Sequence, residues 1–186
     1  MAEAIVLAGG FSSRMRENKM HLIIKDKPLL LNTIDSIKPF VSKIIVVTGH
    51  YDQDIRSFLN EDATIKIIFN EHYPDGMFSS VLKGVREVKE DFFILPGDIP
   101  FIKKETFIAL LNGSKKVRYP TYKGKDGHPL FISKDLKESL LKEDKKSNLK
   151  IFRDKQDKEP IIVDDENILR DIDTLNEYLK IKEERK

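Results

Sequence analysis

Two glycines and two cations follow the first apolar run of the chain. The run ends at Gly9 and Gly10, and Ser12, Arg14 and Lys19 come soon after. Glycine lets the backbone approach a ligand closely, and the free N–H groups of such a turn form a concavity that binds anions. The two cations add positive charge to it. These residues are suited to hold a nucleoside triphosphate, although neither the Walker spacing nor GxGxxG is present. The alternative is an ordinary turn between a strand and a helix.

Another apolar run delivers an aspartate. Phe92–Leu95 predicts a strand that leads into Pro96-Gly97-Asp98, which places Asp98 at the carboxyl edge of a sheet. Mg²⁺ commonly accompanies a bound triphosphate, and it is held by one or two carboxylates plus phosphates and water. Asp98 is therefore a candidate Mg²⁺ ligand. The alternative is a turn aspartate.

Two further carboxylates lie near the C-terminus, in Asp171-Ile172-Asp173-Thr174. If this segment is extended, Ile172 points into the core and both aspartates share the opposite side. Asp173 or Thr174 also fits the N-cap of a following helix. Metal binding and helix capping both remain open here, as does the choice between Asp171 and Asp173 as the ligand.

Polar residues also begin a predicted helix in the middle of the chain. The segment that starts at Asn70 contains Gly76, which gives access to a ligand, and then Met77, Ser79 and Ser80. Free N–H groups and the dipole favour an anion at the first turn of a helix. Anion binding and simple serine capping are both consistent with this pattern.

His128 stands at the rim of a late apolar run, in Gly127-His128-Pro129. It can bind a phosphate or stack within a turn. The chain has four histidines and no cysteine, and no histidine pair has metal spacing, so the sequence predicts no zinc site and no disulfide.

The elements that must position these residues alternate in the first half of the chain. Four short, mostly apolar runs predict buried parallel strands: Ala4–Ala8, Lys43–Thr48, Thr64–Phe69 and Asp91–Pro96. Three amphipathic stretches between them predict helices: Pro28–Lys38, with Pro28 in the first turn, Asp52–Leu59 and Phe78–Val88. The alternation predicts βαβ units, and ligands bind at the carboxyl ends of such strands.

After Pro100 this alternation stops. A hairpin-type insertion is predicted from two extended runs around a turn at Gly124–Gly127. The predicted elements are a helix at Lys104–Leu111, extended runs at Lys116–Tyr122 and Pro129–Ser133, helices at 134–143 and 147–155, a strand at Pro160–Val163 and a helix from Thr174.

Length and composition predict one soluble domain over residues 1–186. The formal charge of +2 gives no electrostatic case for a nucleic-acid partner, although residues 142–158 and 180–186 are locally basic. No apolar segment is long enough to span a membrane, and residues 4–8 are too short for the core of a signal peptide. A cytoplasmic enzyme or binding protein is expected.

Taken in order, the motifs resemble the MobA-like nucleotidyltransferase family, and within it most closely the molybdenum cofactor cytidylyltransferases. The first motif is L-A-G-G-x-S-x-R-M-x(3)-K, and the last is D-x-D-T. Between them lie N-x(5)-G-M-x-x-S, the strand that ends in Asp98, and G-H-P. The resemblance runs from Val6 to Thr174, and Arg16 stands where the family often has glycine.

The resemblance implies a Rossmann-like three-layer α/β/α fold with a mostly parallel sheet, of the nucleotide-diphospho-sugar transferase type. It also implies Mg²⁺-dependent transfer of a nucleotide to a phosphorylated acceptor, most simply molybdenum cofactor, and a molybdoenzyme client. Catalysis would involve Arg14, Lys19 and Asp98, with metal at Asp98 and Asp173. The nucleotide site would comprise Leu7, Ala8, Gly9, Gly10, Ser12, Arg14, Lys19, Asn70, Gly76 and Ser80, and the acceptor site Met77, Ser79 and His128.

Three questions stay open at this level. The A-G-G string at Ala8–Gly10 is similar to the guanylyltransferase branch, whereas G-H-P and D-x-D-T are similar to the cytidylyltransferase branch. The weight of motifs favours CTP over GTP. A sugar-phosphate or alcohol-phosphate nucleotidyltransferase is the nearest enzymatic alternative. A non-catalytic module that binds and delivers a nucleotide or cofactor is the alternative of another class.

Overall fold

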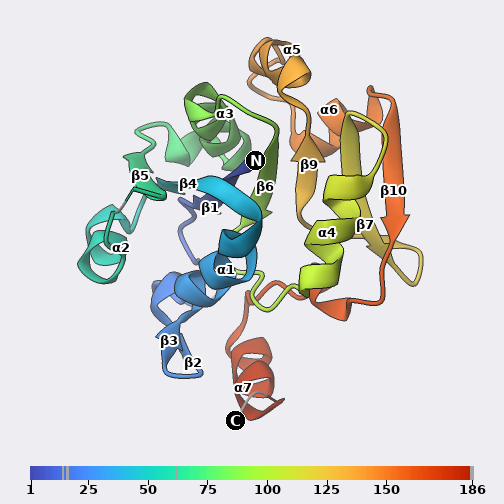
Figure 1. The fold of residues 1–186 in the computed structure, drawn as a ribbon. Helices are drawn as coiled ribbons and strands as arrows, with labels where there is room; N and C mark the ends of the chain where they lie inside the picture. The colour runs from blue at the N-terminus through green and yellow to red at the C-terminus, as the bar shows by residue number, and fades with distance from the viewer. Residues whose placement is uncertain (14, 16, 62, 185–186) are drawn as a thin grey trace.

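The computed structural model describes residues 1–13, 15, 17–61 and 63–184 of the chain. Eight strands form its main sheet (Figure 1): β1 (Ala2–Ala8), β4 (Val41–Thr48), β5 (Ile65–Phe69), β6 (Phe92–Pro96), β7 (Val117–Tyr122), β8 (Lys125–Asp126), β9 (Leu130–Ile132) and β10 (Lys158–Ile162). A separate small hairpin, which the sequence did not predict, pairs β2 (Ile23–Ile24) with β3 (Lys27–Pro28).

The main sheet follows the order β10-β7-β9-β6-β1-β4-β5, with β8 paired to β7. Its β6-β1-β4-β5 part is entirely parallel, which confirms the prediction from the four apolar runs. The predicted hairpin-type insertion is built into this sheet, because β9 lies antiparallel between β6 and β7. All three residues of β9 are buried, so the strand needs neighbours on both sides and cover on both faces.

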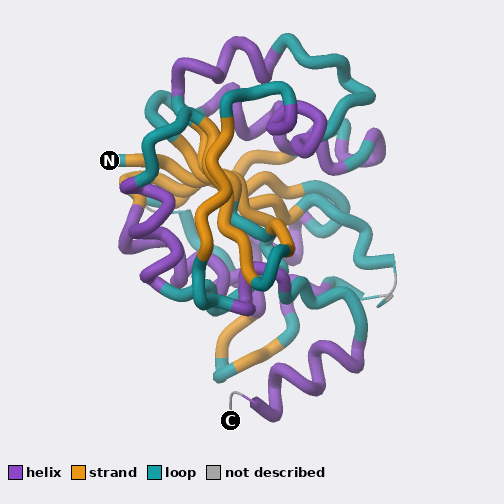
Figure 2. Tube along the Cα trace, turned by 90° about the vertical axis from the view of Figure 1, so that its right-hand side faces the viewer, coloured by secondary structure: helices purple, strands orange, loops and turns teal. Residues whose placement is uncertain are grey.

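Helices cover both faces of the sheet, and Figure 2 shows the strands enclosed between them. One face carries α1 (Leu29–Ile37), α2 (Asp52–Phe58) and α4 (Lys104–Asn112); the other carries α3 (Met77–Glu87), α5 (Lys137–Leu141) and α6 (Leu149–Asp154). Successive side chains of β1 point to opposite faces of the sheet, so each face has apolar residues for its helices to cover. Val6 packs with the first group of helices, and Ile5 and Leu7 pack with the second. The remaining helices are α7 (Leu175–Glu184) and the 3₁₀ turns η1 (Lys19–His21), η2 (Lys38–Phe40), η3 (Tyr73–Asp75), η4 (Lys134–Leu136) and η5 (Glu166–Leu169).

One helix start differs from what the sequence predicts, and another matches it. Pro28 lies just outside α1 as its N-cap, with a ψ of 142°, because the preceding residues are held in the β2–β3 hairpin. At α7, Thr174 and Glu177 form a capping box: the Glu177 N–H donates to Thr174 Oγ1 at 3.3 Å, and the Glu177 carboxylate accepts from the Thr174 N–H at 2.8 Å. Thr174 therefore caps α7, as one of the two sequence alternatives predicts.

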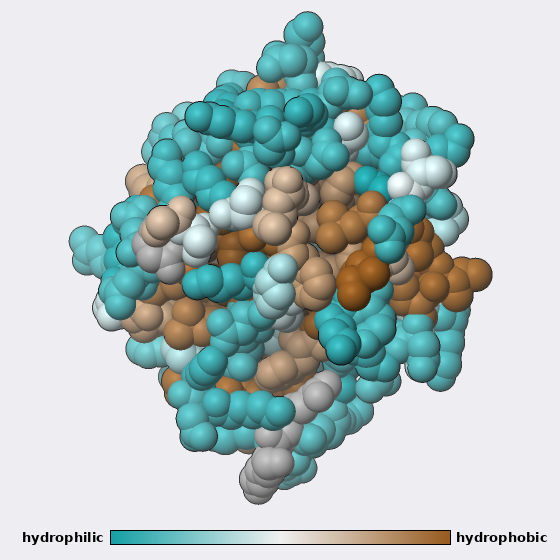
Figure 3. All heavy atoms as spheres, in the orientation of Figure 1, coloured by the Kyte–Doolittle hydropathy of each residue, from teal (hydrophilic) through white to brown (hydrophobic). Residues whose placement is uncertain are grey.

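The surface is mostly polar. Hydrophilic residues cover much of the face that carries α1 and α4, and hydrophobic residues show through toward its middle (Figure 3).

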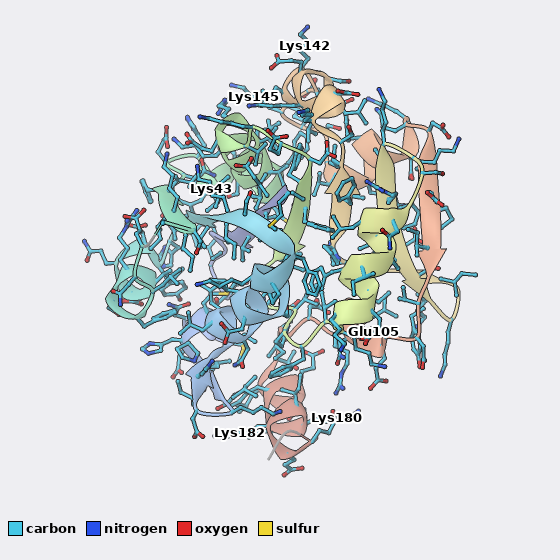
Figure 4. All side chains as sticks on the ribbon, in the orientation of Figure 1. Lys43, Glu105, Lys142, Lys145, Lys180 and Lys182 are labelled. Carbon is cyan, nitrogen blue, oxygen red and sulfur yellow. The ribbon has the colours of Figure 1, made fainter. Side chains whose placement is uncertain are left out.

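The two lysine-rich stretches lie far apart, since Lys142 and Lys145 lie beside α5 whereas Lys180 and Lys182 lie on α7 (Figure 4). Among the described residues, no helix combines the length and apolar character needed to span a bilayer.

The closest approach between α3 and the sheet depends on Gly84. A Cβ at this position would lie 2.5 Å from Ile5 Cγ2 and 3.1 Å from Val47 Cγ2. We expect Gly84→Ala to lower the free energy of unfolding, because overpacking of about 1–3 kcal/mol exceeds the gain of about 1 kcal/mol in helix propensity. Urea unfolding measures this difference, and equal or greater stability of the variant would contradict it.

Candidate functional site

A pocket of about 390 Å³ opens at the carboxyl ends of β1 and β6. It brings together most of the residues that the sequence singles out, from three separate segments of the chain. They are Leu7, Gly9, Gly10, Lys19, Gly76, Met77, Ser80 and Asp98. A volume of this size is within the range of small-molecule sites.

The first loop packs closely against the start of α3. A Cβ at Gly9 would lie 3.1 Å from Ser80 Oγ and 3.5 Å from the Thr48 carbonyl oxygen. Gly10 has open space at the same position. Gly9 therefore allows two segments to meet, and Gly10 leaves backbone accessible at the pocket.

Lys19 lies between two carboxylates. Its Nζ donates to Asp98 Oδ2 and, at 2.5 Å, to Asp173 Oδ1. Burial by itself lowers the pKa of Lys19, but the charges and hydrogen bonds of the two aspartates outweigh burial and raise that pKa above its ordinary value. The Lys19 side chain is thus a fixed ammonium at neutral pH.

Backbone hydrogen bonds bring these three residues together. The Gly97 N–H donates to the Leu7 carbonyl at 2.9 Å, which ties the loop after β6 to the end of β1. The Ile172 N–H donates to the Asp98 carbonyl at 3.1 Å, which brings the C-terminal segment to the same loop. The Asn18 side chain accepts from the Met20 N–H and caps η1, which carries Lys19. The site is therefore assembled by the sheet order and by contacts distant in sequence.

The two aspartates have the donor set of a hard cation. Both face one point, which the Lys19 ammonium occupies, and Asp98 Oδ1 is buried with no described hydrogen-bond donor. Within the described residues, no group of three or more metal-ligating side chains converges. A pair of carboxylates fits Mg²⁺, which completes its shell with phosphate oxygens and water. Asp171 lies near enough for the charges of Asp173 and Asp98 to add to burial in raising its pKa.

Asn70 joins Ser79 and Ser80 in a hydrogen-bond network, in which Ser79 Oγ is also bonded to the backbone carbonyls of His72 and Gly76. Asn70 Nδ2 donates to Ser79 Oγ at 2.9 Å and to Ser80 Oγ at 3.0 Å, and Asn70 is almost completely buried. Its Oδ1 accepts from the His72 N–H at 3.1 Å. Asn70 and Ser79 line a different cavity from Lys19, whereas Ser80 lines the main pocket. This network fixes the loop that carries Gly76.

The other residues singled out by the sequence fall in three places. Ala8 is buried at the end of β1, and Ser12 Oγ accepts from the Lys19 N–H at 3.3 Å. His128 lines a separate pocket, where burial lowers its pKa. Arg14 lies outside the described residues.

An aromatic cluster at the mouth of the pocket was not found from the sequence. Phe11 lies 5.1 Å from His50 and 5.2 Å from Tyr73, measured between ring centroids. Phe11 is 47% exposed, and Tyr73 lines both the main pocket and the neighbouring one. The sequence contains a pattern that could have predicted part of this cluster, because Gly49-His50 follows β4 in the same way that Gly9-Gly10 follows β1.

Comparisons with known proteins identify relatives of this chain. The chain is 29% identical to the molybdenum cofactor cytidylyltransferase of Escherichia coli strain K12, over 97% of this chain and 95% of that protein. It is 32% identical to a probable molybdenum cofactor guanylyltransferase of Aquifex aeolicus, over 60% of this chain and 53% of that protein. Its fold matches a nucleotidyl transferase from Methanothermobacter thermautotroptrophicus with a TM-score of 0.84 and 21% identity, over 99% and 97% of the two chains. The family model of the MobA-like NTP transferase domain matches residues 4–159, and the chain therefore belongs to the MobA-like NTP transferase family of nucleotidyltransferases.

Proposed function

We propose that the protein transfers a cytidylyl group from CTP to the terminal phosphate of molybdenum cofactor and releases pyrophosphate. The observation that carries this proposal is the convergence of Lys19, Asp98 and Asp173 beside the Gly9–Gly10 loop. Membership of the MobA-like NTP transferase family supports nucleotidyl transfer as the reaction, and the cytidylyltransferase of Escherichia coli aligns over almost the whole chain. We also propose that the protein acts in the cytoplasm and that a molybdoenzyme receives its product.

In this mechanism the backbone of Leu7–Gly10 binds the base and ribose, and Lys19 binds the triphosphate. Lys19 is charged, and when its ammonium moves from between Asp98 and Asp173 to the triphosphate it would stabilise the negative charge that develops as pyrophosphate leaves. Asp98 and Asp173 would hold Mg²⁺, which supplies charge neutralisation on the phosphate oxygens. The acceptor phosphate attacks the α-phosphorus directly, and no side chain needs to form a covalent intermediate.

The choice of base rests on the whole chain rather than on one loop. Ala8–Gly10 is similar to the guanylyl branch, but the place of Gly9 against Ser80 also gives this glycine a packing role. The guanylyltransferase of Aquifex aeolicus aligns over a shorter part of the chain. GTP is therefore the second candidate donor.

Thermal unfolding with each nucleotide tests the donor. We expect CTP with Mg²⁺ to raise the melting temperature more than CTP alone, and more than GTP, ATP or UTP, because ligand binding adds about 2.7 kcal/mol at a hundredfold excess over Kd. A shift with GTP alone would move the assignment to the guanylyl branch. No shift with any nucleotide would contradict the proposal, and Mg²⁺-dependent product formation separates an enzyme from a non-catalytic binding module.

A further inference from the structure

A second cavity lies beyond Asp98 on the β9 side of the sheet. Its volume is about 280 Å³, and His128, Tyr119, Lys150 and Arg153 are among the residues that line it. His128 is an acceptor-site residue that the family resemblance implies, and we infer that two further lining residues, Arg153 and Lys150, recognise the acceptor's phosphate. The inference rests on the proposed function for the identity of the reaction and extends it to the site of the second substrate.

The sheet register places this cavity next to the reaction centre. Ile94 of β6 pairs with Leu130 of β9, and the two strands run antiparallel. Past this pair, β6 ends at Pro96, one residue before Gly97-Asp98, and His128 lies two residues before the start of β9. Consistent with this placement, the negative charge of Asp98 acts on His128 and partly opposes the effect of its burial on the pKa. His128 of the second cavity is therefore close to Asp98 of the nucleotide pocket.

Arg153 is fixed in an orientation suited to bind an anion. Its guanidinium carbon lies 4.2 Å from the centroid of the Tyr119 ring. Nη1 pairs with Asp126 at 2.9 Å and Nε with Asp154 at 3.1 Å, and only 12% of the side chain is exposed. These two ion pairs involve Nη1 and Nε, and among the described contacts Nη2 has none, so it is the nitrogen assigned to the ligand. A guanidinium that is already ordered loses little conformational freedom when it binds a phosphate.

The chemistry of the reaction requires positive charge on the acceptor side. A phosphate monoester carries about −1.5 to −2 charges at neutral pH and must approach an already anionic triphosphate. Lys19 serves the triphosphate side, whereas Lys150 and Arg153 lie on the β9 side, where Asp126 lies in the lining and Asp154 also pairs with Arg153. His128 Nδ1 is shielded from solvent and has no described hydrogen-bond partner, so a ligand hydroxyl or phosphate can satisfy it.

Steady-state kinetics of Arg153→Gln and Lys150→Gln test the inference, with CTP and molybdenum cofactor varied in turn. We expect KM for the acceptor to rise about 10- to 100-fold in Arg153→Gln and less in Lys150→Gln, since hydrogen bonds to charged groups are strong, while KM for CTP changes less than about twofold. Arg153→Lys should lie between wild type and Arg153→Gln. The matched control is Lys155→Gln, which removes a cation beside α6 that pairs with Glu143. An unchanged KM for the acceptor, or an equal rise in both KM values, overturns the inference while the transfer reaction itself stands.

A second measurement does not depend on turnover. The His128 ring signal, assigned by its loss in His128→Gln, is followed by NMR during titration with inorganic phosphate. We expect the signal to shift in the wild-type protein and to shift much less in Arg153→Gln, while both proteins keep similar melting temperatures. No shift in wild type, or the same shift in both, overturns the inference. If wild type transfers no nucleotide to molybdenum cofactor, the proposed function fails, and this titration alone decides whether the cavity binds phosphate.

Discussion

Replacing Asp98 by asparagine is expected to reduce the rate of nucleotide transfer about a thousandfold, while the protein still folds. The reason is that a carboxylate with one buried, unpartnered oxygen loses its charge at the point where Asp173 and Lys19 also converge. A cation bound there would contribute several kcal/mol to the transition state, and about 1.4 kcal/mol corresponds to each factor of ten in rate. Folding should survive, because asparagine has the same shape and Lys19 keeps its contact with Asp173.

The rate and the Mg²⁺ concentration that gives half-maximal activity measure this effect. Asp157→Asn is the matched control, since Asp157 makes an exposed ion pair with Lys115 away from the pocket. Asp171→Asn addresses the choice that the sequence leaves open: we expect a smaller loss, because Asp173 rather than Asp171 contacts Lys19. Wild-type activity in Asp98→Asn would exclude a catalytic role for this carboxylate.

The parallel half of the sheet could be predicted because its strands are buried on both faces. Runs such as Lys43–Thr48 are almost continuously apolar, so strand identity and the carboxyl-edge position of Asp98 follow from local sequence. The place of β9 between β6 and β7 could not be predicted in the same way. Three apolar residues do not specify which neighbours they pair with, and the answer depends on contacts far apart in the chain.

In the candidate site, too, local sequence predicts the residues but not the contacts between them. Lys19, Asp98 and Asp173 were each identified from local motifs, but their direct contact joins residues 79 and 154 positions apart. No local pattern reports such a contact. Asn70 and Ser79 illustrate a different limit: their residue types suit ligand binding, but in the structure they bond to each other.

Arg153 was missed because its sequence context is that of an ordinary charged helix. Its neighbours Lys150, Asp154 and Lys155 predict a solvated surface. Only the fold shows that Arg153 stacks on Tyr119 from another element and is mostly buried. Charge alone therefore does not separate a solvated helix face from a binding residue.

The replacement of Lys19 by methionine is expected to affect both stability and catalysis. Without the ammonium, Asp98 and Asp173 face each other at a site where their side chains are only 12% and 25% exposed. Removing one partner of a fully buried pair costs about 3–5 kcal/mol, and the partial exposure of Asp173 should reduce this loss. Transfer should slow about 10²- to 10³-fold, as for the loss of one donor to a developing anion.

Thermal unfolding of Lys19→Met with and without Mg²⁺ or Mn²⁺ separates these effects. A divalent cation should stabilise the variant more than wild type, because it takes the place of the ammonium between the two carboxylates. The variant and wild type can be compared at neutral pH. Because the pKa of Lys19 is raised, the stability that its ion pairs contribute is fully present below the ordinary pKa of 10.5. This stability is lost only as pH rises through the raised pKa. Lys27→Met, which removes an exposed ion pair with Asp35, should respond to each cation as wild type does. An equal response of Lys19→Met and wild type would show that Asp98 and Asp173 do not form a cation site, and the carboxylates would then serve only to hold Lys19 in place.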